Sequence, residues 1–191
     1  DFGVPVVPGS EGKIKDVDHA IRISNEIGFP VLLKASAGGG GRGMQIVKND
    51  EELRKVLPIL KQEALSFFGN SDIYVEKFID SPRHIEIQVM CDTHGNFLHL
   101  YERDCSVQRR NQKVIEEALA PDISEDNKNK LYKICTDAMS RMGYLGLGTL
   151  EFLYSDGNFY FMEMNTRIQV EHPITEMITR VDLVREQICI A

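Results

Sequence analysis

The chain has 191 residues, of which 42% are hydrophobic, so it is long enough to bury the core of one domain or of two closely packed lobes. Its net charge of -7 argues against a general nucleic-acid-binding surface, because phosphate groups are attracted to the opposite sign. The four cysteines lack paired spacing and no apolar run approaches a membrane span, which disfavours a disulfide framework, a zinc site and a transmembrane segment.

The first part of the chain is predicted to form a small lobe around a glycine-rich loop. A helix is expected from about Asp16 to just before Gly28, and a strand follows in PVLLKAS. After the glycine run, MQIV predicts a second strand, and Asn49 or Asp50 can cap a helix that continues to about Phe67. The segment IYVEKF then completes the lobe with another strand.

The second part of the chain is predicted to contain two hairpins and two helical regions. HIEIQVM and FLHLYERD alternate around residues 94–96, and LGTLEFLYS faces FYFMEMN across a second turn. Helices are expected at 124–142 and from about Thr175 onwards. This mixture predicts an α+β fold, with a glycine-loop lobe at 1–78 packed over a larger antiparallel sheet at 79–191.

The glycine run AGGGGRGM resembles two nucleotide-binding motifs but fits neither. Gly38, Gly40 and Gly43 have dinucleotide-fingerprint spacing, yet a strand follows where that fingerprint opens a helix, and Met44 stands where a P-loop requires lysine. What remains is a flexible hairpin whose backbone amides can wrap a polyphosphate, with Lys34 adding a positive charge. Taken alone, the run is equally typical of a mobile surface loop beside a solvated lysine.

A second feature is a basic cluster on an acidic background. Arg103, Arg109, Arg110 and Lys113 fall within eleven positions. We expect this cluster to meet a small anionic substrate.

The last hairpin is predicted to bring two carboxylates together. If residues 156–158 form a three-residue turn, Ser155 pairs with Phe159, and counting back places Glu151 opposite Glu163 on one face of the sheet. Like charges at cross-strand distance are destabilising, so this arrangement indicates a divalent cation between them.

The surroundings of this carboxylate pair favour the same interpretation. Asn165 lies two residues after Glu163 and adds an amide oxygen, a donor set that suits Mg²⁺ or Mn²⁺ bound to substrate phosphates. Leu153, Phe159 and Phe161 are expected on the same face, which makes it apolar on either side of the pair. The alternative is a solvated face, the usual position of charged residues in antiparallel strands.

Four long segments together resemble the biotin carboxylase family: KASAGGGGRGM, EKFIDSPRHIEIQV, ERDCSVQRRNQKVIEEA and EMNTRIQVEHPITEMIT. The resemblance covers essentially the whole chain. It implies an ATP-grasp fold with a glycine-loop lid, and a ligase that uses ATP and bicarbonate to carboxylate carrier-bound biotin through carboxyphosphate. It also implies Mg²⁺ or Mn²⁺, with two ions expected, and biotin as a carrier-bound substrate.

The resemblance implies a set of ATP-binding residues. Lys34 would contact the phosphates beneath the glycine lid, Glu76, Lys77 and Ile79 would define the adenine slot, and Leu153 would form its apolar floor. Without the resemblance, Glu76 could equally pair with a surface lysine, and His84 could merely cap a strand. The implied residues are Lys34, Gly39, Gly40, Gly41, Glu76, Lys77, Ile79, His84, Gln108, Asn111 and Leu153.

The resemblance also implies the metal ligands and the bicarbonate and biotin site. Glu171 would be the general base on bicarbonate, Arg167 would stabilise the biotin enolate, and Lys113 would neutralise bicarbonate. Considered singly, Arg167 and Glu171 could form only a surface ion pair. The implied metal ligands are Glu151, Glu163 and Asn165, and the implied bicarbonate and biotin residues are Lys113, Arg167, Gln169, Val170 and Glu171.

Some properties of the whole protein remain open at this point. Asn111 and Ala37 depart from the usual bacterial acetyl-CoA carboxylase pattern and leave the acyl-CoA undecided. The family has segments before Asp1 and after Ala191, and the chain lacks Met-Lys-Met, so biotin is expected on another domain or protein. The expected partners are a biotin carboxyl carrier, a carboxyltransferase and further copies of the chain, with no nucleic acid or membrane, in the cytoplasm or the mitochondrial matrix.

Two alternative functions are weighed against the carboxylase. One is another ATP-grasp ligase of carbamoyl-phosphate or purine synthesis, which the segment RIQVEH disfavours. The other is an inactive nucleotide-binding module, which the presence of Lys113, Arg167 and Glu171 disfavours.

Overall fold

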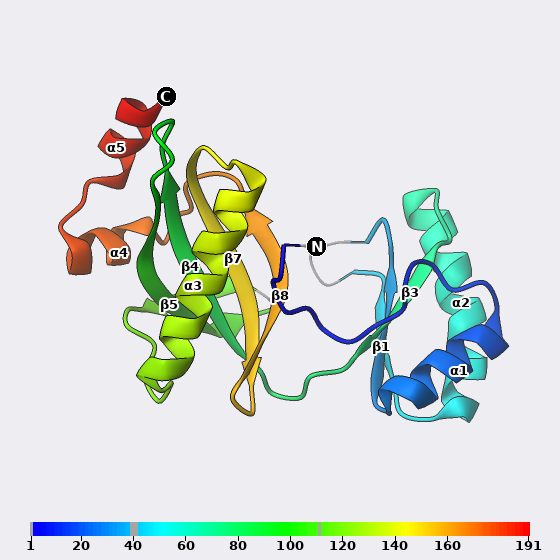
Figure 1. Ribbon diagram of the computed structural model, residues 1–191. Coiled ribbons are helices and arrows are strands. Elements are labelled where there is room, and N and C mark those ends of the chain that lie inside the picture. Colours follow the sequence, from blue (N-terminus) through cyan, green and yellow to red (C-terminus); the bar gives the residue numbers. More distant parts are fainter. Residues whose placement is uncertain (1, 39–41, 111) are drawn as a thin grey trace. The chain divides into compact units, whose positions relative to one another are not determined.

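A computed structural model describes residues 2–38, 42–110 and 112–191 (Figure 1). The predicted site residues Gly39, Gly40, Gly41 and Asn111 lie outside the described residues. The chain forms two compact units, one of Val7–Asp80 and one of Asp1–Val6 with Ser81–Ala191.

The division differs from the expected units at 1–78 and 79–191 in two respects, the smaller being that residues 79 and 80 belong with the Val7–Asp80 unit. The segment up to Val6 belongs with the second unit, because Val6 forms a parallel bridge to Phe161, and the Phe161 amide donates to the Pro5 carbonyl over 2.7 Å. This contact joins positions far apart in the sequence, and local patterns do not report it.

The Val7–Asp80 unit consists of a three-stranded antiparallel sheet and two helices, with strand order β2-β1-β3. Asp16 caps the first helix by accepting from the His19 amide, and Asn49 caps the second by accepting from the Glu52 amide, as such side chains do at helix starts. The elements, all expected from the sequence, are α1 (Val17–Ile27), β1 (Val31–Ala35), β2 (Met44–Val47), α2 (Asp50–Phe68) and β3 (Ile73–Lys77).

The core of this unit lies between the sheet and the two helices. Alternate residues of β1 and β3, such as Leu33 and Val75, are fully buried, and so is Leu53 of α2. Period-2 burial in the strands and an apolar stripe on each helix account for the packing.

The second unit is built on a five-stranded antiparallel sheet with the order β6-β5-β4-β7-β8. Its helix α3 begins after Ser124, whose side chain accepts from the Asn127 amide, and ends at Gly143 in a left-handed conformation. The elements are β4 (Arg83–Cys91), β5 (Phe97–Arg109), β6 (Gln112–Glu117), α3 (Glu125–Met142), β7 (Gly146–Ser155), β8 (Asn158–Asn165), α4 (His172–Thr179) and α5 (Leu183–Ile190).

Two parts of this unit differ from the sequence expectation. Strand β6 was not predicted; it pairs with the long strand β5. The C-terminal helical region begins at His172 rather than near Thr175 and is divided at Arg180, which has a φ of 59°. Asp182 then caps α5 by accepting from the Arg185 amide.

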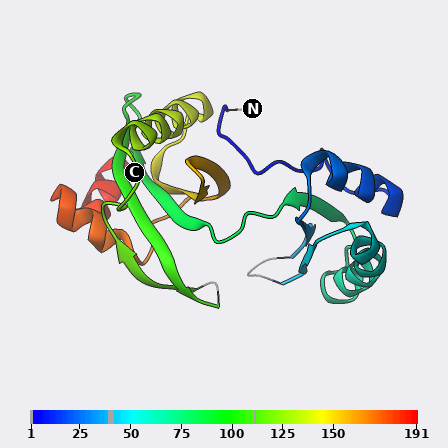
Figure 2. The same cartoon turned by 90° about the horizontal axis from the view of Figure 1, so that it is seen from below.

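The two faces of the large sheet have different chemistry. Ile85, Ile87 and Val89 of β4 point to the apolar core, much of which lies against α3, and Figures 1 and 2 show that helix lying across β4 and β5. The alternating residues Glu86 and Gln88 therefore point to the opposite face, yet both are fully buried. Buried charges on a sheet face require partners, and these partners form the site.

The β7–β8 hairpin corrects two details of the predicted register. Ser155 pairs with Asn158 rather than Phe159, so the turn has two residues, Asp156 and Gly157, both with positive φ. A bulge between Phe152 and Glu151 then takes up one extra residue on β8 and restores the predicted pairing of Glu151 with Glu163.

The bulge also reverses the predicted face of two aromatic residues. Phe161 pairs with Phe152, and both pack in the core beside α3 together with Phe159. The expectation that Phe159 and Phe161 share the face of the carboxylate pair is therefore wrong. A single bulged residue changes the inward and outward alternation of everything beyond it.

Candidate active site

A row of charged residues crosses four strands of the large sheet. Arg103 of β5 pairs with Glu86 of β4, Glu86 pairs with Glu151 of β7, and Glu151 pairs with Glu163 of β8. Arg103 and Glu86 are fully buried, Glu151 is 5% exposed, and Glu163 is exposed. The row contains three adjacent carboxylates and only one cation. Such an arrangement requires further positively charged groups next to the carboxylates.

Lys113 of β6 supplies a second cation above the row. Its Nζ lies 2.5 Å from Glu86 Oε2, 3.0 Å from Glu151 Oε1 and 2.5 Å from Glu171 Oε1. Burial alone would lower the pKa of Lys113, but the carboxylates of Glu86, Glu171 and Glu151 outweigh it and raise the pKa above its ordinary value. Lys113 is therefore held as a cation.

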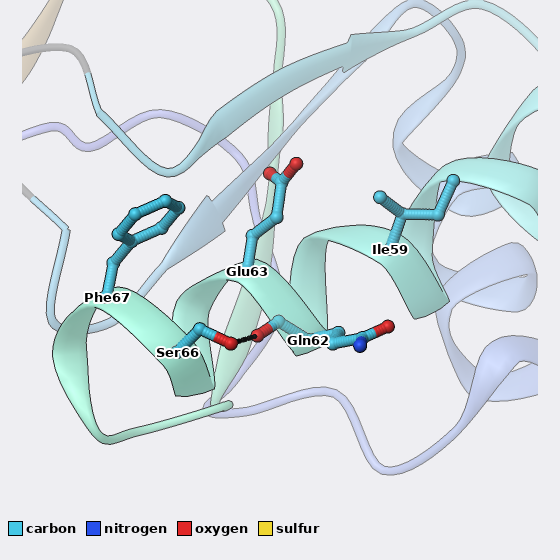
Figure 3. A pocket seen from close by; sticks show the side chains of 5 residues that line it. All are labelled: Ile59, Gln62, Glu63, Ser66 and Phe67. Atoms are coloured by element: carbon cyan, nitrogen blue, oxygen red, sulfur yellow. Dashed lines mark hydrogen bonds between the residues drawn. The ribbon is translucent and has the colours of Figure 1, made fainter.

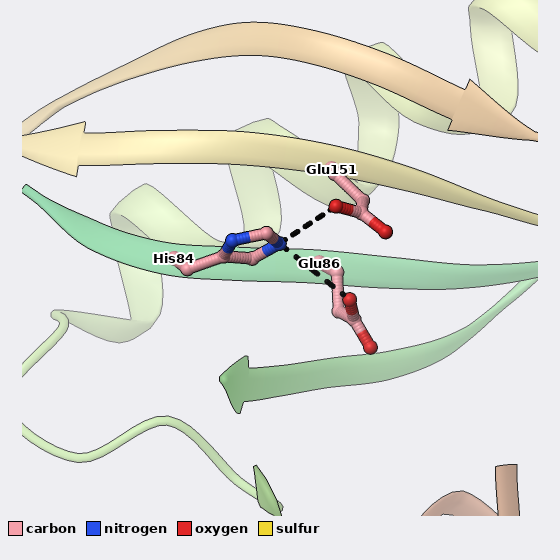
Figure 4. A group of neighbouring side chains, drawn as sticks. All are labelled: His84, Glu86 and Glu151. Carbon is pink, nitrogen blue, oxygen red and sulfur yellow. Dashed lines mark ion pairs between the residues drawn. The ribbon is translucent and has the colours of Figure 1, made fainter. Parts of the chain in front are cut away.

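Glu151 is the most heavily hydrogen-bonded carboxylate of the group. Besides Lys113, its Oε1 accepts from Asn165 Nδ2 at 2.8 Å and from Gln169 Nε2 at 2.7 Å. His84 Nε2 lies 2.8 Å from its other oxygen, as Figure 4 shows. Burial opposes ionisation, but His84 and Lys113 outweigh it and lower the pKa of Glu151 from 4.5 to about 2.

Glu171 and His84 both contact this charge cluster. Glu171 stands immediately before α4, and burial would raise its pKa, yet the hydrogen bond from Lys113 and the charge of Arg103 help to lower it. The ring of His84 lies 3.0 Å from Gln108 Nε2, which also donates to the Cys105 carbonyl over 2.8 Å. The structure thus brings His84 and Gln108 into contact.

Arg167 and Val170 face solvent at the edge of the cluster. Arg167 donates to Asn165 Oδ1 over 3.1 Å and to the Ile168 carbonyl over 3.2 Å, and Val170 is 92% exposed. Because Glu171 pairs with Lys113, the alternative of a simple surface ion pair between Arg167 and Glu171 does not hold in the described residues. Arg167 and Glu171 thus have different partners in the described part of the chain.

The oxygen ligands predicted for a divalent cation fit that role. Glu163 and Asn165 lie on β8 beside Glu151, and Asn165 Nδ2 is 3.5 Å from Glu163 Oε1. Two carboxylates and an amide match the preference of Mg²⁺ and Mn²⁺ for oxygen donors, provided that the Asn165 amide turns to present its oxygen. His84, Glu86 and Glu151 form a second group of converging ligand atoms, within 4.8 Å of one another.

The predicted residues of the Val7–Asp80 unit form a smaller cluster of their own. Lys34 Nζ pairs with Glu76 Oε2 at 2.8 Å, and both side chains are partly exposed. The pairing of Glu76 with a lysine, one of the two alternatives for this residue, is therefore present. Lys77 Nζ donates to the carbonyls of Gly28 and Phe29 at the end of α1, and Ile79 is half-buried after β3.

Sequence reasoning missed two members of the charged row. Glu86 was not assigned any role, although its alternation with His84 on one strand face was a usable signal. Arg103 was grouped with Arg109 and Arg110 as a site for an anionic substrate, but it is buried among protein acceptors, whereas the other two are exposed.

The hollow shown in Figure 3 contains none of the predicted site residues. Its lining comes from α2 alone, so side chains of a second element do not converge on it. The lining residues are Ile59, Gln62, Glu63, Ser66 and Phe67.

Comparison with known proteins places the whole chain in one family. The model described as "Carbamoyl-phosphate synthase L chain, ATP binding domain" matches residues 1–191. The chain belongs to this family. Within the described residues, no helix combines the length and apolar character needed to cross a membrane.

Several relatives are biotin carboxylases. The chain is 54% identical over 190 residues to the biotin carboxylase of Haemophilus influenzae and to the chloroplastic biotin carboxylase of Arabidopsis thaliana. Each comparison covers 99% of this chain, which spans 42% and 35% of the lengths of these relatives. The resemblance seen in the sequence motifs is thereby confirmed.

Solved structures show the same likeness. The biotin carboxylase domain of 2-oxoglutarate carboxylase from Hydrogenobacter thermophilus has a TM-score of 0.88 and 53% identity, covering 99% of this chain and 42% of that one. Biotin carboxylase from Campylobacter jejuni has a TM-score of 0.89 and 47% identity, covering 99% and 43%. The predicted α+β ATP-grasp fold is confirmed.

Proposed function

We propose that this chain is the nucleotide- and bicarbonate-binding core of a biotin carboxylase, which uses ATP to activate bicarbonate and transfers the carboxyl group to carrier-bound biotin. The observation that carries the proposal is the contact of Lys113 with Glu171 above a row of buried carboxylates. This contact places Lys113, the cation that would bind bicarbonate, beside Glu171, the ionised carboxylate that would act as the base. The related domain from Hydrogenobacter thermophilus was solved with MgADP and bicarbonate, which supports the same ligands here.

In the first step, the chain activates bicarbonate as a nucleophile. Lys113 neutralises the bound anion, and Glu171, whose pKa is lowered and which is therefore ionised at neutral pH, accepts the bicarbonate proton. An oxygen of the resulting carbonate bonds to the γ-phosphorus as the bond to the ADP oxygen breaks, giving carboxyphosphate and ADP. The short contact between Lys113 and Glu171 must lengthen to admit the substrate.

In the second step, the carboxyl group moves to biotin. The ring nitrogen of biotin loses its proton to the departing phosphate and bonds to the carboxyl carbon, while the bond between that carbon and the phosphate oxygen breaks. Arg167 stabilises the enolate oxygen of biotin, since a fixed guanidinium suits a developing oxyanion. Gln169 and Val170 complete this pocket.

Nucleotide binding is assigned to two sets of residues. Glu151, Glu163 and Asn165 would hold Mg²⁺ or Mn²⁺, which would neutralise charge on the phosphate oxygens. On the large sheet, His84 and Gln108 contact the ribose and phosphate region and Leu153 contacts the adenine. In the Val7–Asp80 unit, Lys34 contacts the phosphates, and Glu76, Lys77 and Ile79 contact the adenine.

The whole protein is proposed to act with a biotin carboxyl carrier and a carboxyltransferase, as a homo-oligomer in the cytoplasm or an organelle. Named relatives include pyruvate and 2-oxoglutarate carboxylases, so the final acceptor stays open.

The test measures ADP release from Mg-ATP, with and without bicarbonate and free biotin, on the full polypeptide that contains this chain. We expect ADP release that requires bicarbonate and rises with biotin. Turnover indifferent to both would point instead to another ligase of the family, and nucleotide binding without turnover would point to an inactive module.

A further inference from the structure

Arg103 of β5 lies beneath the charged cluster and bonds to side chains of the strands and of the segment around it. Its side chain is fully buried, and it donates five hydrogen bonds within the described residues. The acceptors are Glu86 Oε1 at 2.6 Å, Gln88 Oε1 at 2.8 Å, Thr175 Oγ1 at 2.8 Å, Gln169 Oε1 at 3.0 Å and Thr149 Oγ1 at 3.3 Å. A guanidinium has five N–H donors, and here all of its nitrogens are engaged.

The acceptors come from separate elements. Glu86 and Gln88 lie on β4 and Thr149 on β7, whereas Gln169 lies between β8 and α4, and Thr175 lies within α4. Arg103 therefore ties the segment that carries Glu171 to the polar face of the sheet.

Two chains of hydrogen bonds lead from Arg103, one to Glu171 and one to Glu151. Arg103 occupies one oxygen of Glu86, and Lys113 takes the other and bonds in turn to Glu171. Lys113 is thereby shared between Glu86 and the proposed base Glu171.

The second chain passes through an amide. Because Arg103 donates to Gln169 Oε1, the Gln169 amide must direct its NH₂ group away from Arg103, and it donates to Glu151 Oε1 over 2.7 Å. The backbone carbonyl of Gln169 contacts the ring of His172 at 2.8 Å, so the orientation of this residue continues into the start of α4.

We propose that Arg103 is a positioning residue for bicarbonate activation: its planar guanidinium holds the 166–175 segment on the sheet and thereby sets the geometry of Glu171 and Lys113. This inference rests on the proposed function for its catalytic consequence. The shape of the guanidinium carries the effect, because a lysine cannot reach five acceptors in one plane.

The test uses Arg103→Lys, which keeps the charge, Arg103→Met, which removes it, and the matched control Lys128→Met. Lys128 is a buried cation on α3 that pairs with Glu125 of the same helix and with Glu102 of β5, which points to the opposite face of the sheet from Arg103. Thermal unfolding of all three variants identifies any that fail to fold.

The first readout is amide hydrogen exchange in the full polypeptide, and it does not depend on the proposed activity. We expect faster exchange at residues 166–175 in Arg103→Lys, with β4 and β7 still protected, and no such change in Lys128→Met. Equal protection of 166–175 in Arg103→Lys and in the unaltered protein would overturn the inference.

The second readout separates substrate steps. In Arg103→Lys we expect kcat/KM for bicarbonate to fall by about 10–100-fold, as for other groups that orient reacting residues, with KM for ATP unchanged. If Arg103→Lys keeps the kcat/KM for bicarbonate of the unaltered protein, the positive charge alone is sufficient and the inference is overturned. If the unaltered protein releases no ADP in response to bicarbonate, the proposed function fails, and the exchange result still decides whether Arg103 positions the segment.

Discussion

Replacing Glu151 by glutamine should remove a pH-dependent contribution to the stability of the large sheet. Glu151 is 5% exposed, and its pKa is lowered from 4.5 to about 2. Because the folded-state pKa is the lower one, the unfolded chain binds the proton first as the pH falls. The stabilisation is therefore complete above about pH 5 and is lost as the pH falls towards 2.

The magnitude follows from the two pKa values. At about 1.36 kcal/mol per pH unit, the full contribution to the free energy of unfolding is about 3 kcal/mol. About 2 kcal/mol of it should be lost between pH 5 and pH 3, because the unfolded carboxylate is almost wholly protonated at pH 3 and the folded one is not.

The assay is hydrogen exchange of the buried amides of β7, measured between pH 5 and pH 3 and corrected for the intrinsic exchange rate. These amides report opening of the sheet that carries Glu151 rather than of the Val7–Asp80 unit. The unaltered chain should lose about 2 kcal/mol more than Glu151→Gln over this range. Glu117→Gln, an exposed carboxylate in β6 of the same sheet, is the control and should follow the unaltered chain. Parallel curves for the unaltered chain and Glu151→Gln would refute the reasoning.

Four further outcomes are expected. Glu163→Gln should raise the Mn²⁺ concentration needed for half-maximal nucleotide binding, because one charged ligand is lost; an unchanged titration would contradict the metal assignment. Glu171→Gln should abolish bicarbonate-dependent ADP release and spare Mg-ATP binding, so a loss of nucleotide affinity would argue against its role as base. Tyr132→Phe should lower the free energy of unfolding by about 1–3 kcal/mol, since the buried Glu102 loses a hydrogen-bond donor; denaturation with no change would show that the bond contributes nothing. Gly157→Ala, at a φ of 79°, should cost about 1 kcal/mol in the same measurement, and a stabilising effect would be incompatible with this turn geometry.

Most helices and strands follow from local patterns. Asp16, Asn49 and Ser124 each accept a hydrogen bond at the start of a predicted helix, and β4 alternates between a core face and a polar face. These features depend on neighbours within a few positions, and the sequence alone is sufficient to identify them. Strand β6 was missed because its residues are mostly exposed and show no clear alternation.

The carboxylate pair shows how a local argument can reach the right partners through an incorrect register. The count assumed a three-residue turn, whereas the turn has two residues and a bulge follows it. The shorter turn and the bulge shift the register by one residue in opposite directions. The pairing of Glu151 with Glu163 is therefore as predicted, whereas Phe159 and Phe161, which lie between the turn and the bulge, have other partners than predicted. Turn length and bulge position depend on packing of the β8 aromatic residues against the core, which is a tertiary property.

The sequence by itself determined the family, the positions of most elements, and the residue types that belong to the candidate site. Only the tertiary structure decided which charged residues pair with one another. The sequence indicated no role for Glu86 and suggested an anion site for Arg103, whereas both are buried and bonded to each other. Arg103 finds acceptors as distant as Thr175, 72 positions away. A charge that leaves water needs an opposite charge or a hydrogen bond, and the fold alone determines which side chains are near enough to provide it.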